Sequence, residues 1–147
     1  MNREQVLEIP VLPFFVYGTL MSGHYNHSII EREAADIRVA YLNGYDMYSM
    51  GAFPGIVPGL GIIHGELIHI NPQHYDYVLH NLDQLEGYSH GCNNGIYLRR
   101  VGIVTCTDTN EQIEAWFYQW NRQVSGPKYI NSGRWAQGIK KGRKTDE

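Results

Sequence analysis

The stretch Val11-Leu-Pro-Phe-Phe-Val-Tyr-Gly-Thr-Leu20 decides the fold. Its first seven residues form a short apolar run rich in aromatic and β-branched side chains, which predicts a buried strand. Pro13 stands near the start of this strand, where a missing N–H is tolerated. Gly18 ends the run, so we expect a tight loop from Gly18 to Gly23.

Strands and helices follow this first strand in alternation. Hydrophobic periodicity and cap residues predict strands over residues 37–42, 62–70, 96–106 and 113–120, and helices from Asn26 or Ser28 to about Ala35 and from Asn71 to Gly87. Residues 45–61 are rich in Gly and Pro and predict a loop with short extended pieces. A polar turn around residues 108–111 predicts that the last two strands form a hairpin. After Gly126 the pattern fades into a polar tail.

The order of these elements predicts an α+β protein with one domain and a curled or barrel-like sheet flanked by helices. We expect residues 1–147 to be a single domain with its core at about 11–120 and a basic tail at about 126–147. The chain of 147 residues can bury a sizeable core, and its 43% hydrophobic and 18% charged residues exclude a disordered chain. No apolar run reaches the roughly 20 residues of a membrane span, and the N-terminal pattern is not that of a signal peptide.

The cysteines and histidines do not form a recognisable metal motif. Cys92 and Cys106 are fourteen positions apart, match no zinc spacing, and are expected to be free thiols of a cytoplasmic protein. On a strand, the side chains of His64 and His69 would point to opposite faces. His24 and His27 could share a helical face, but without a third ligand nearby we expect surface histidines.

Tyr17-Gly-Thr-Leu20 is the first candidate site. A sharp bend at Gly18 can point successive N–H groups into one concavity, which suits a carboxylate or an oxyanion. The alternative from these four residues alone is an ordinary turn that ends a strand. The segment is not a phosphate-binding P-loop, since no Gly-Lys-Ser/Thr follows.

Glu86, in Leu82-Asp-Gln-Leu-Glu86-Gly87, is the second candidate. It is expected at the last residue of a helix that buries Leu82 and Leu85. Both the negative end of the helix dipole and an apolar pocket would raise the pKa of its carboxyl toward the range of a general acid or base. The alternative is a solvated glutamate at a frayed helix end.

The two candidates together resemble a known family. Phe15-Val-Tyr-Gly-Thr-Leu20, followed by Gly23 and Asn26-His27, resembles the N-terminal signature of the γ-glutamylcyclotransferase-like superfamily, closest to its γ-glutamylamine cyclotransferase branch. Leu82-Asp-Gln-Leu-Glu86 is similar to the second signature, Tyr97-Leu-Arg99 to the Tyr-x-Arg strand after it, and Phe53-Pro-Gly-Ile-Val57 to the aromatic-Pro-Ala segment between them. Here Gly55 replaces the usual Ala, and the link from Tyr88 to Gly95 looks longer than usual, which suggests a flexible lid.

The resemblance implies a small mixed β-barrel flanked by helices and a reaction without cofactor or metal. That reaction releases 5-oxoproline from a small-molecule γ-glutamyl substrate. It makes Glu86 the catalytic acid/base. We expect the backbone of Gly18, Thr19 and Leu20 to hold the substrate α-carboxylate, and Tyr17 and Tyr97 to line the pocket or donate a hydrogen bond.

A non-catalytic module that binds γ-glutamyl compounds or amino acids on the same scaffold is the alternative function. A third possibility is nucleic-acid binding through the tail, which carries six of the twelve basic residues. Because the whole chain has a net charge of −3, we expect a solvated tail and neither a nucleic-acid nor a membrane partner. The sequence supports no prediction of the oligomeric state.

Overall fold

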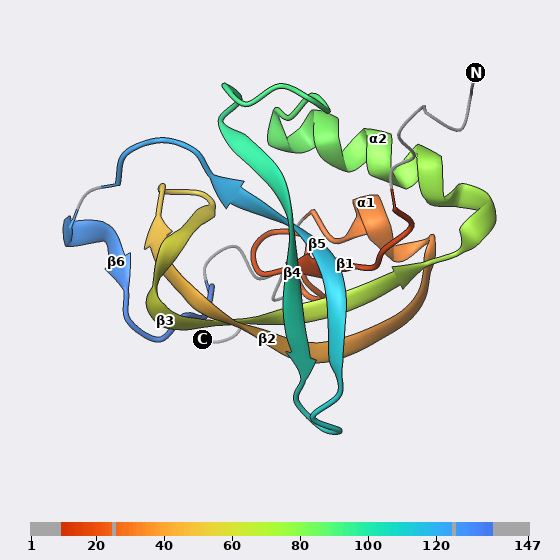
Figure 1. Ribbon diagram of the computed structural model, residues 1–147, viewed down its shortest axis with the longest axis horizontal. Helices are drawn as coiled ribbons and strands as arrows, with labels where there is room; N and C mark the ends of the chain where they lie inside the picture. Colours follow the sequence, from red (N-terminus) through yellow and green to blue (C-terminus); the bar gives the residue numbers. More distant parts are fainter. Residues whose placement is uncertain (1–9, 25, 125, 137–147) are drawn as a thin grey trace, which may run out of the picture.

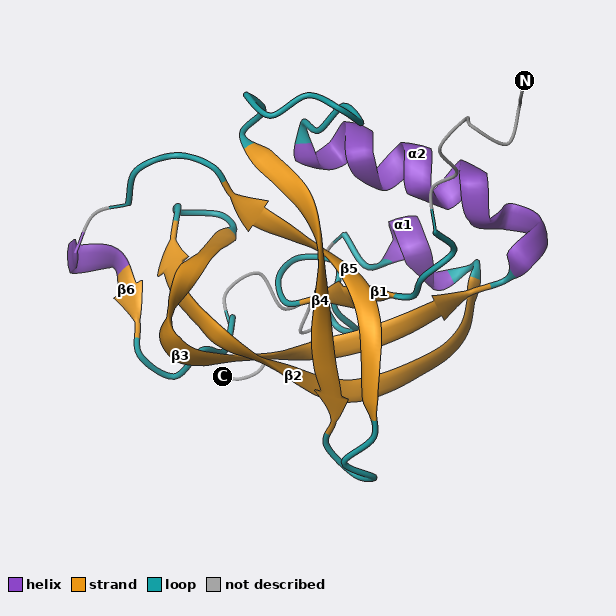
Figure 2. Ribbon diagram, in the orientation of Figure 1, coloured by secondary structure: helices purple, strands orange, loops and turns teal. Residues whose placement is uncertain are grey.

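The computed structural model describes residues 10–24, 26–124 and 126–136. These residues form strands and helices in the order β1 (Phe14–Val16), α1 (Ser28–Glu31), β2 (Ala34–Ser49), β3 (Pro54–Ile70), η2 (Pro72–His74), α2 (Tyr75–Glu86), β4 (Tyr97–Cys106), β5 (Gln112–Trp120), η3 (Gly126–Lys128) and β6 (Tyr129–Ile130), where η marks a 3₁₀ turn. Figure 1 shows α2 lying beside a strongly curved sheet, and Figure 2 separates the helices from the strands by colour.

The sheet closes on itself. Its strand order is β3-β1-β5-β4-β2-β6, and an additional pairing of β2 with β3 joins the ends of the first five strands into a barrel. The pairing of β1 with β5 is parallel, whereas β1–β3, β2–β3, β2–β4 and β4–β5 are antiparallel. The prediction of an α+β fold with a small mixed barrel is therefore confirmed.

Strand β1 is buried on both faces, which explains its uninterrupted apolar sequence. Phe14 and Val16 belong to a core that the barrel wall shares with α2, whereas Phe15 and Tyr17 belong to the core inside the barrel. All four side chains are at most 6% exposed. Since neighbouring residues of a strand point to opposite faces, this one short segment holds both cores together.

The prediction of a loop over residues 45–61 is wrong. Most of this stretch belongs to the long β2–β3 hairpin, whose pairing continues from Tyr45↔Pro58 to Ser49↔Pro54 after a register shift between Asn43 and Tyr45. Its glycines make room for a side chain: a Cβ at Gly59 would overlap the carboxylate of Asp46, which accepts a hydrogen bond from Gly61 N–H at 3.0 Å.

The first helix is also shorter than predicted. α1 ends at Glu31, and β2 begins at Ala34, which pairs with Ile70 of β3. Pairing of β2 with β3 thus places in a strand residues that the local sequence pattern assigns to the helix. The second helix begins as a 3₁₀ turn after Asn71, whose side chain makes no capping hydrogen bond, and it ends at Gly87 as predicted, with a left-handed φ of 71°.

The described part of the C-terminal segment is not a polar tail. Strand β6 pairs with β2, His64 N–H donates to Gly133 O at 2.9 Å, and Trp135 is 3% exposed within the barrel core. The sequence missed this because two residues of strand and one tryptophan give no periodic pattern. The rest of the expected tail, residues 137–147, lies outside the described residues.

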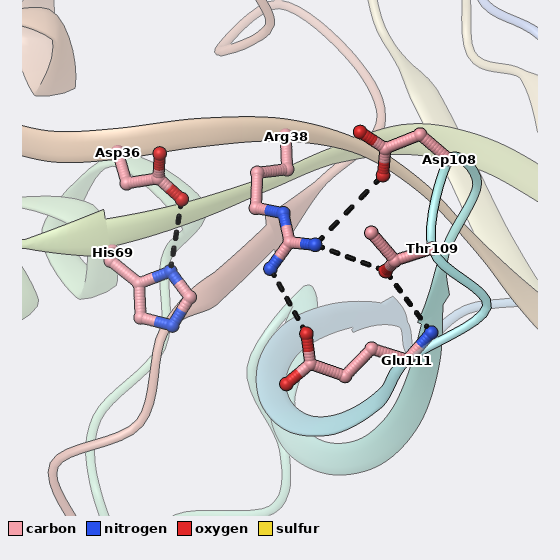
Figure 3. A network of polar contacts seen from close by, with 6 residues as sticks. All are labelled: Asp36, Arg38, His69, Asp108, Thr109 and Glu111. Atoms are coloured by element: carbon pink, nitrogen blue, oxygen red, sulfur yellow. Dashed lines mark hydrogen bonds and ion pairs between the residues drawn. The ribbon is translucent and has the colours of Figure 1, made fainter.

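A surface network connects β2 to the turn between β4 and β5 (Figure 3). Arg38 donates to Glu111 at 3.2 Å and to Thr109 at 3.1 Å, and it lies 3.8 Å from Asp108. Such exposed pairs are screened by solvent and contribute little to stability. Both cysteines are free, as predicted. Among the described residues, no helix combines the length and apolar character that crossing a bilayer requires.

Candidate active site

A cavity of about 140 Å³ lies where β1 ends, β3 and β4 begin, and α2 terminates. Its walls come from five separate parts of the chain. They are residues 15–20 with Asn26, Phe53 with Pro54, Leu85 with Glu86, and the two tyrosines Tyr97 and Tyr118. Tyr17, Gly18, Thr19, Leu20, Glu86 and Tyr97, which the sequence places in one site, therefore all line one cavity.

The carbonyl and N–H groups of the loop that follows β1 differ in their hydrogen bonding. The three carbonyls are occupied by the protein: Gly18 O accepts from Met21 N–H at 3.0 Å, Thr19 O from Asn26 N–H at 2.9 Å, and Leu20 O from His27 Nδ1 at 2.7 Å. By contrast, no described residue accepts a hydrogen bond from the N–H groups of residues 18–20. The loop, which lines the cavity, thus has three adjacent peptide N–H groups without an acceptor among the described residues, and these are candidate donors to a bound anion.

Hydrogen bonds from Asn26 and His27 hold this loop in place. The Asn26 amide also donates to Thr19 Oγ1 at 3.0 Å, so Asn26 contacts Thr19 twice. Because Leu20 O can only accept, His27 Nδ1 carries the proton of this bond. The expectation that His24 and His27 are surface histidines is wrong: they are 4% and 9% exposed. Sequence spacing showed no loop folded over His27, so it could not predict this burial.

Close packing leaves no room for a Cβ at two glycines around the cavity. A Cβ at Gly18 would approach the Pro54 ring to 2.8 Å, and a Cβ at Gly55 would approach Trp120 Cβ to 2.9 Å. The chain bends at Gly18, as predicted, but without a left-handed φ, so it is the close approach to Pro54 that requires glycine there. The same crowding explains why Gly55 stands where the resemblance has alanine.

Glu86 is the last residue of α2, as predicted, and Gly87 caps the helix behind it. The carboxyl lines the cavity, and burial raises its pKa from 4.5 to about 7. Desolvation is the cause, because an apolar surrounding disfavours the charged form. Leu85 differs from the prediction: it is 41% exposed, whereas Leu82 is fully buried.

Both predicted tyrosines donate their phenol protons to the main chain. Tyr17 Oη donates to Tyr118 O at 2.6 Å, and Tyr97 Oη donates to Pro54 O at 2.6 Å. Burial, together with the nearby Glu86, raises the pKa of each phenol. In this arrangement they are neutral walls whose oxygens can still accept a hydrogen bond, which favours the lining role over the donor role.

A polar chain behind the cavity joins α2 to β4 and β5. Tyr118 Oη donates to Asp83 Oδ1 at 2.7 Å, and Arg99 Nε donates to the same oxygen at 2.9 Å. The Arg99 guanidinium also stacks on Trp116, 4.3 Å from the ring centre. Asp83 precedes Glu86 by three residues on the same helix, so this chain fixes the helix end that carries Glu86.

Sequence reasoning missed several cavity residues. Phe53 and Pro54 belong to a segment that resembles the family, and this resemblance could have identified them as cavity residues. Tyr118 gave no such signal, because only the pairing of β4 with β5 brings it to the site. Residues 88–95, expected to form a lid, do not line this cavity, and Asn121 and Arg122 hold Gly95 O at 2.9 and 2.8 Å.

Comparison with known proteins agrees with this architecture. Residues 14–137 match the family described as gamma-glutamyl cyclotransferase, AIG2-like. The chain is 34% identical over 121 residues to the gamma-glutamylcyclotransferase family protein YtfP of Escherichia coli K12, covering 82% of this chain and 93% of that protein. The solution NMR structure of Escherichia coli ytfP superimposes with a TM-score of 0.59 at 31% identity, covering 86% of this chain and 97% of the other. A solution structure from Arabidopsis thaliana gives 0.60 at 27% identity, covering 88% and 72%. The chain therefore belongs to the gamma-glutamyl cyclotransferase, AIG2-like family.

Proposed function

We propose that this protein is a cyclotransferase that cleaves a γ-glutamyl amide or γ-glutamylamine and releases 5-oxoproline and a free amine. One observation carries the proposal. The cavity is lined both by the loop of residues 18–20, whose peptide N–H groups donate to no described residue, and by a carboxyl whose pKa is about 7. The first feature suits the substrate α-carboxylate, and the second suits proton transfer at its α-amine.

The reaction proceeds within one substrate molecule. The ionised form of Glu86 removes a proton from the α-ammonium group, and the amine nitrogen then attacks the γ-carbonyl carbon. When the bond from that carbon to the leaving nitrogen breaks, Glu86 returns the proton to the departing amine, and the attacking nitrogen loses its second proton to solvent and becomes the lactam N–H of 5-oxoproline. A carboxyl with a pKa of about 7 exists in both forms near neutral pH, so it can act as base and then as acid.

Positioning supplies much of the remaining rate. Well-oriented intramolecular attack can be worth about 7–11 kcal/mol, provided the reacting atoms are held close. Here the bound α-carboxylate fixes one end of the glutamyl chain, and the buried rings of Tyr17, Tyr97 and Tyr118 restrict the rest. A bent substrate fits this enclosure with its amine near Glu86.

The test is a panel of γ-glutamyl amino acids, γ-glutamyl-ε-lysine and other γ-glutamylamines, with 5-oxoproline and free amine measured separately. We expect both products in equal amounts from at least one compound. Glutamate in place of 5-oxoproline would indicate hydrolysis and would refute the proposal. Saturable binding without any product would instead favour the non-catalytic module.

A further inference from the structure

The loop of residues 87–96, which connects α2 to β4, contributes to a second cavity of about 260 Å³ (Figure 1). The cavity is lined by residues 88 and 91–93 of the loop and by residues 98–100 of β4, and it shares no lining residue with the candidate active site. Residues 91–93 and Arg100 are exposed, so the cavity is open to solvent. The proposed cyclotransferase reaction makes no use of it.

Arginine side chains gather around this loop. Arg99 and Arg100 line the cavity from β4, and Arg122 of the segment after β5 donates to two loop carbonyls at 2.8 and 3.2 Å. Arg99 pairs with Asp83, so the charge that an incoming ligand meets comes chiefly from the exposed Arg100 and Arg122. This local positive charge is opposite in sign to the net charge of the chain, which is −3. The cavity therefore suits an anion.

Arg99 also has hydrogen-bond donors that the fold leaves unused. Its side chain is 1% exposed, and its guanidinium carbon lies 4.3 Å from the ring centre of Trp116 and 5.1 Å from that of Tyr88. Nε donates to Asp83 at 2.9 Å, whereas Nη1 and Nη2 are buried without an acceptor among the described residues. Buried guanidinium N–H groups without an acceptor are costly. A carboxylate that enters beside Tyr88, itself a wall of the cavity, would supply that acceptor.

Cys92 adds a reactive group to the same cavity. Its thiol is free and exposed, and it donates a hydrogen bond to Asn94 Oδ1 at 2.7 Å. Cys106, the other cysteine, is buried in the barrel core. Thiol–disulfide exchange requires an accessible thiol, and charged groups around that thiol favour reagents of the opposite charge. Cys92 is thus the cysteine that a reagent in solution can reach, and arginines surround the approach to it.

We propose that this cavity is a thiol-modification site, at which Cys92 forms a mixed disulfide with a small thiol that carries a carboxylate. Cys92 loses its proton to solvent, and its thiolate attacks one sulfur of a disulfide made from two such thiols. The bond between Sγ and that sulfur forms as the original disulfide bond breaks. The other half departs as a thiolate and takes up a proton, so Cys92 is oxidised and the departing half is reduced. Arg99 and Arg100 hold the carboxylate of the half that stays.

The test compares three disulfides whose arms have the same two-carbon spacer and end in a carboxylate, a hydroxyl or an ammonium group: 3,3′-dithiodipropionate, bis(2-hydroxyethyl) disulfide and cystamine. Adduct formation on the full chain is followed by mass spectrometry. Each rate is divided by the rate for a peptide of residues 89–95, which contains Cys92 and no arginine and so corrects for the leaving group. We expect the corrected rate of dithiodipropionate to exceed that of cystamine about 10-fold at low ionic strength, and less than about 3-fold in 0.5 M NaCl. Attraction by the net charge of the chain would give the reverse order.

Variants test whether the cavity causes the preference. Arg100→Gln should reduce the 10-fold preference to about 3-fold or less. Arg134→Gln changes the net charge equally but removes an exposed arginine that does not line the cavity, and it should leave the preference unchanged. Cys92→Ser should form no adduct, since Cys106 is buried.

Three results would overturn the proposal: a corrected rate for cystamine equal to or above that for dithiodipropionate, equal effects of the two arginine variants, or undiminished adduct formation in Cys92→Ser. None of these measurements involves a γ-glutamyl compound, so the outcome is independent of the proposed function.

Discussion

Replacing Glu86 with glutamine should abolish turnover and make the protein more stable at alkaline pH. The amide keeps the size of the side chain but cannot accept a proton. Losing a positioned general acid/base typically costs about 10²–10⁴-fold in rate, which corresponds to about 2.7–5.4 kcal/mol in the activation barrier. We expect Glu86→Gln to lower kcat by that factor or more, and to change KM much less.

The stability effect follows from the raised pKa. In the unfolded chain the carboxyl ionises near 4.5, and in the folded protein near 7, so between these values the folded state binds more protons. The free energy of unfolding therefore decreases as pH rises through this window and levels off above it. The full difference amounts to about 3 kcal/mol as an upper figure. Glutamine does not titrate, so the free energy of unfolding of the variant does not decrease in this way.

The assay is thermal unfolding of both proteins at pH 5, 6, 7 and 8, beside kinetics. Since about 1 kcal/mol shifts Tm by roughly 2–4 °C for a chain of this size, the variant should gain up to about 10 °C on the wild type between pH 5 and 8. Glu114→Gln, which changes an exposed glutamate of β5, is the matched control and should keep both activity and Tm. A Tm difference that does not grow with pH would refute the burial argument, and wild-type kcat would refute the role of Glu86.

Three further substitutions test the rest of the site and the barrel. Asn26→Ala removes the amide donor to Thr19 Oγ1. It should raise KM about 3–10-fold in steady-state kinetics, with little change in Tm. An unchanged KM would show that this loop does not bind the substrate. Gly55→Ala places a Cβ against Trp120 and should lower stability by about 1–3 kcal/mol in denaturant unfolding, and a neutral result would show that Trp120 can move aside. Trp135→Ala should cost about 3–5 kcal/mol by the same measurement, whereas a loss below 1 kcal/mol would contradict its place in the core.

The parts of the fold that sequence could predict are those with local signals. The apolar run of β1, the Gly87 cap and the hairpin of β4 and β5 each have a pattern of period or composition that acts within a few residues. The β2–β3 hairpin has no such local pattern, because its Gly and Pro residues indicate a loop. Glycine occurs in this strand because the side chain of Asp46 crosses over Gly59. β6 and Trp135 depend on distant partners in the same way.

The candidate site likewise has parts that local sequence signals predict and parts that they do not. Glu86 and the loop of residues 18–20 lie at the ends of regular elements, so sequence could place each of them. Their meeting in one cavity came only from resemblance, because pairing in the barrel, and no local rule, brings residue 18 close to residue 86. Tyr118 and the burial of His27 could not be predicted from sequence at all.

The hydrogen bonds of the two cavity tyrosines connect barrel closure with the site. Tyr17 at the end of β1 is joined to β5, and Tyr97 at the start of β4 is joined to β3, so each phenol binds an element other than its own. Breaking either bond would leave a buried phenol without its acceptor, which is costly away from water. The walls of the cavity are therefore part of the bonding that closes the barrel and cannot relax independently of it. A reaction in which the substrate must be held bent over its own carbonyl benefits from such walls, because its rate depends on how little the reacting atoms can move apart.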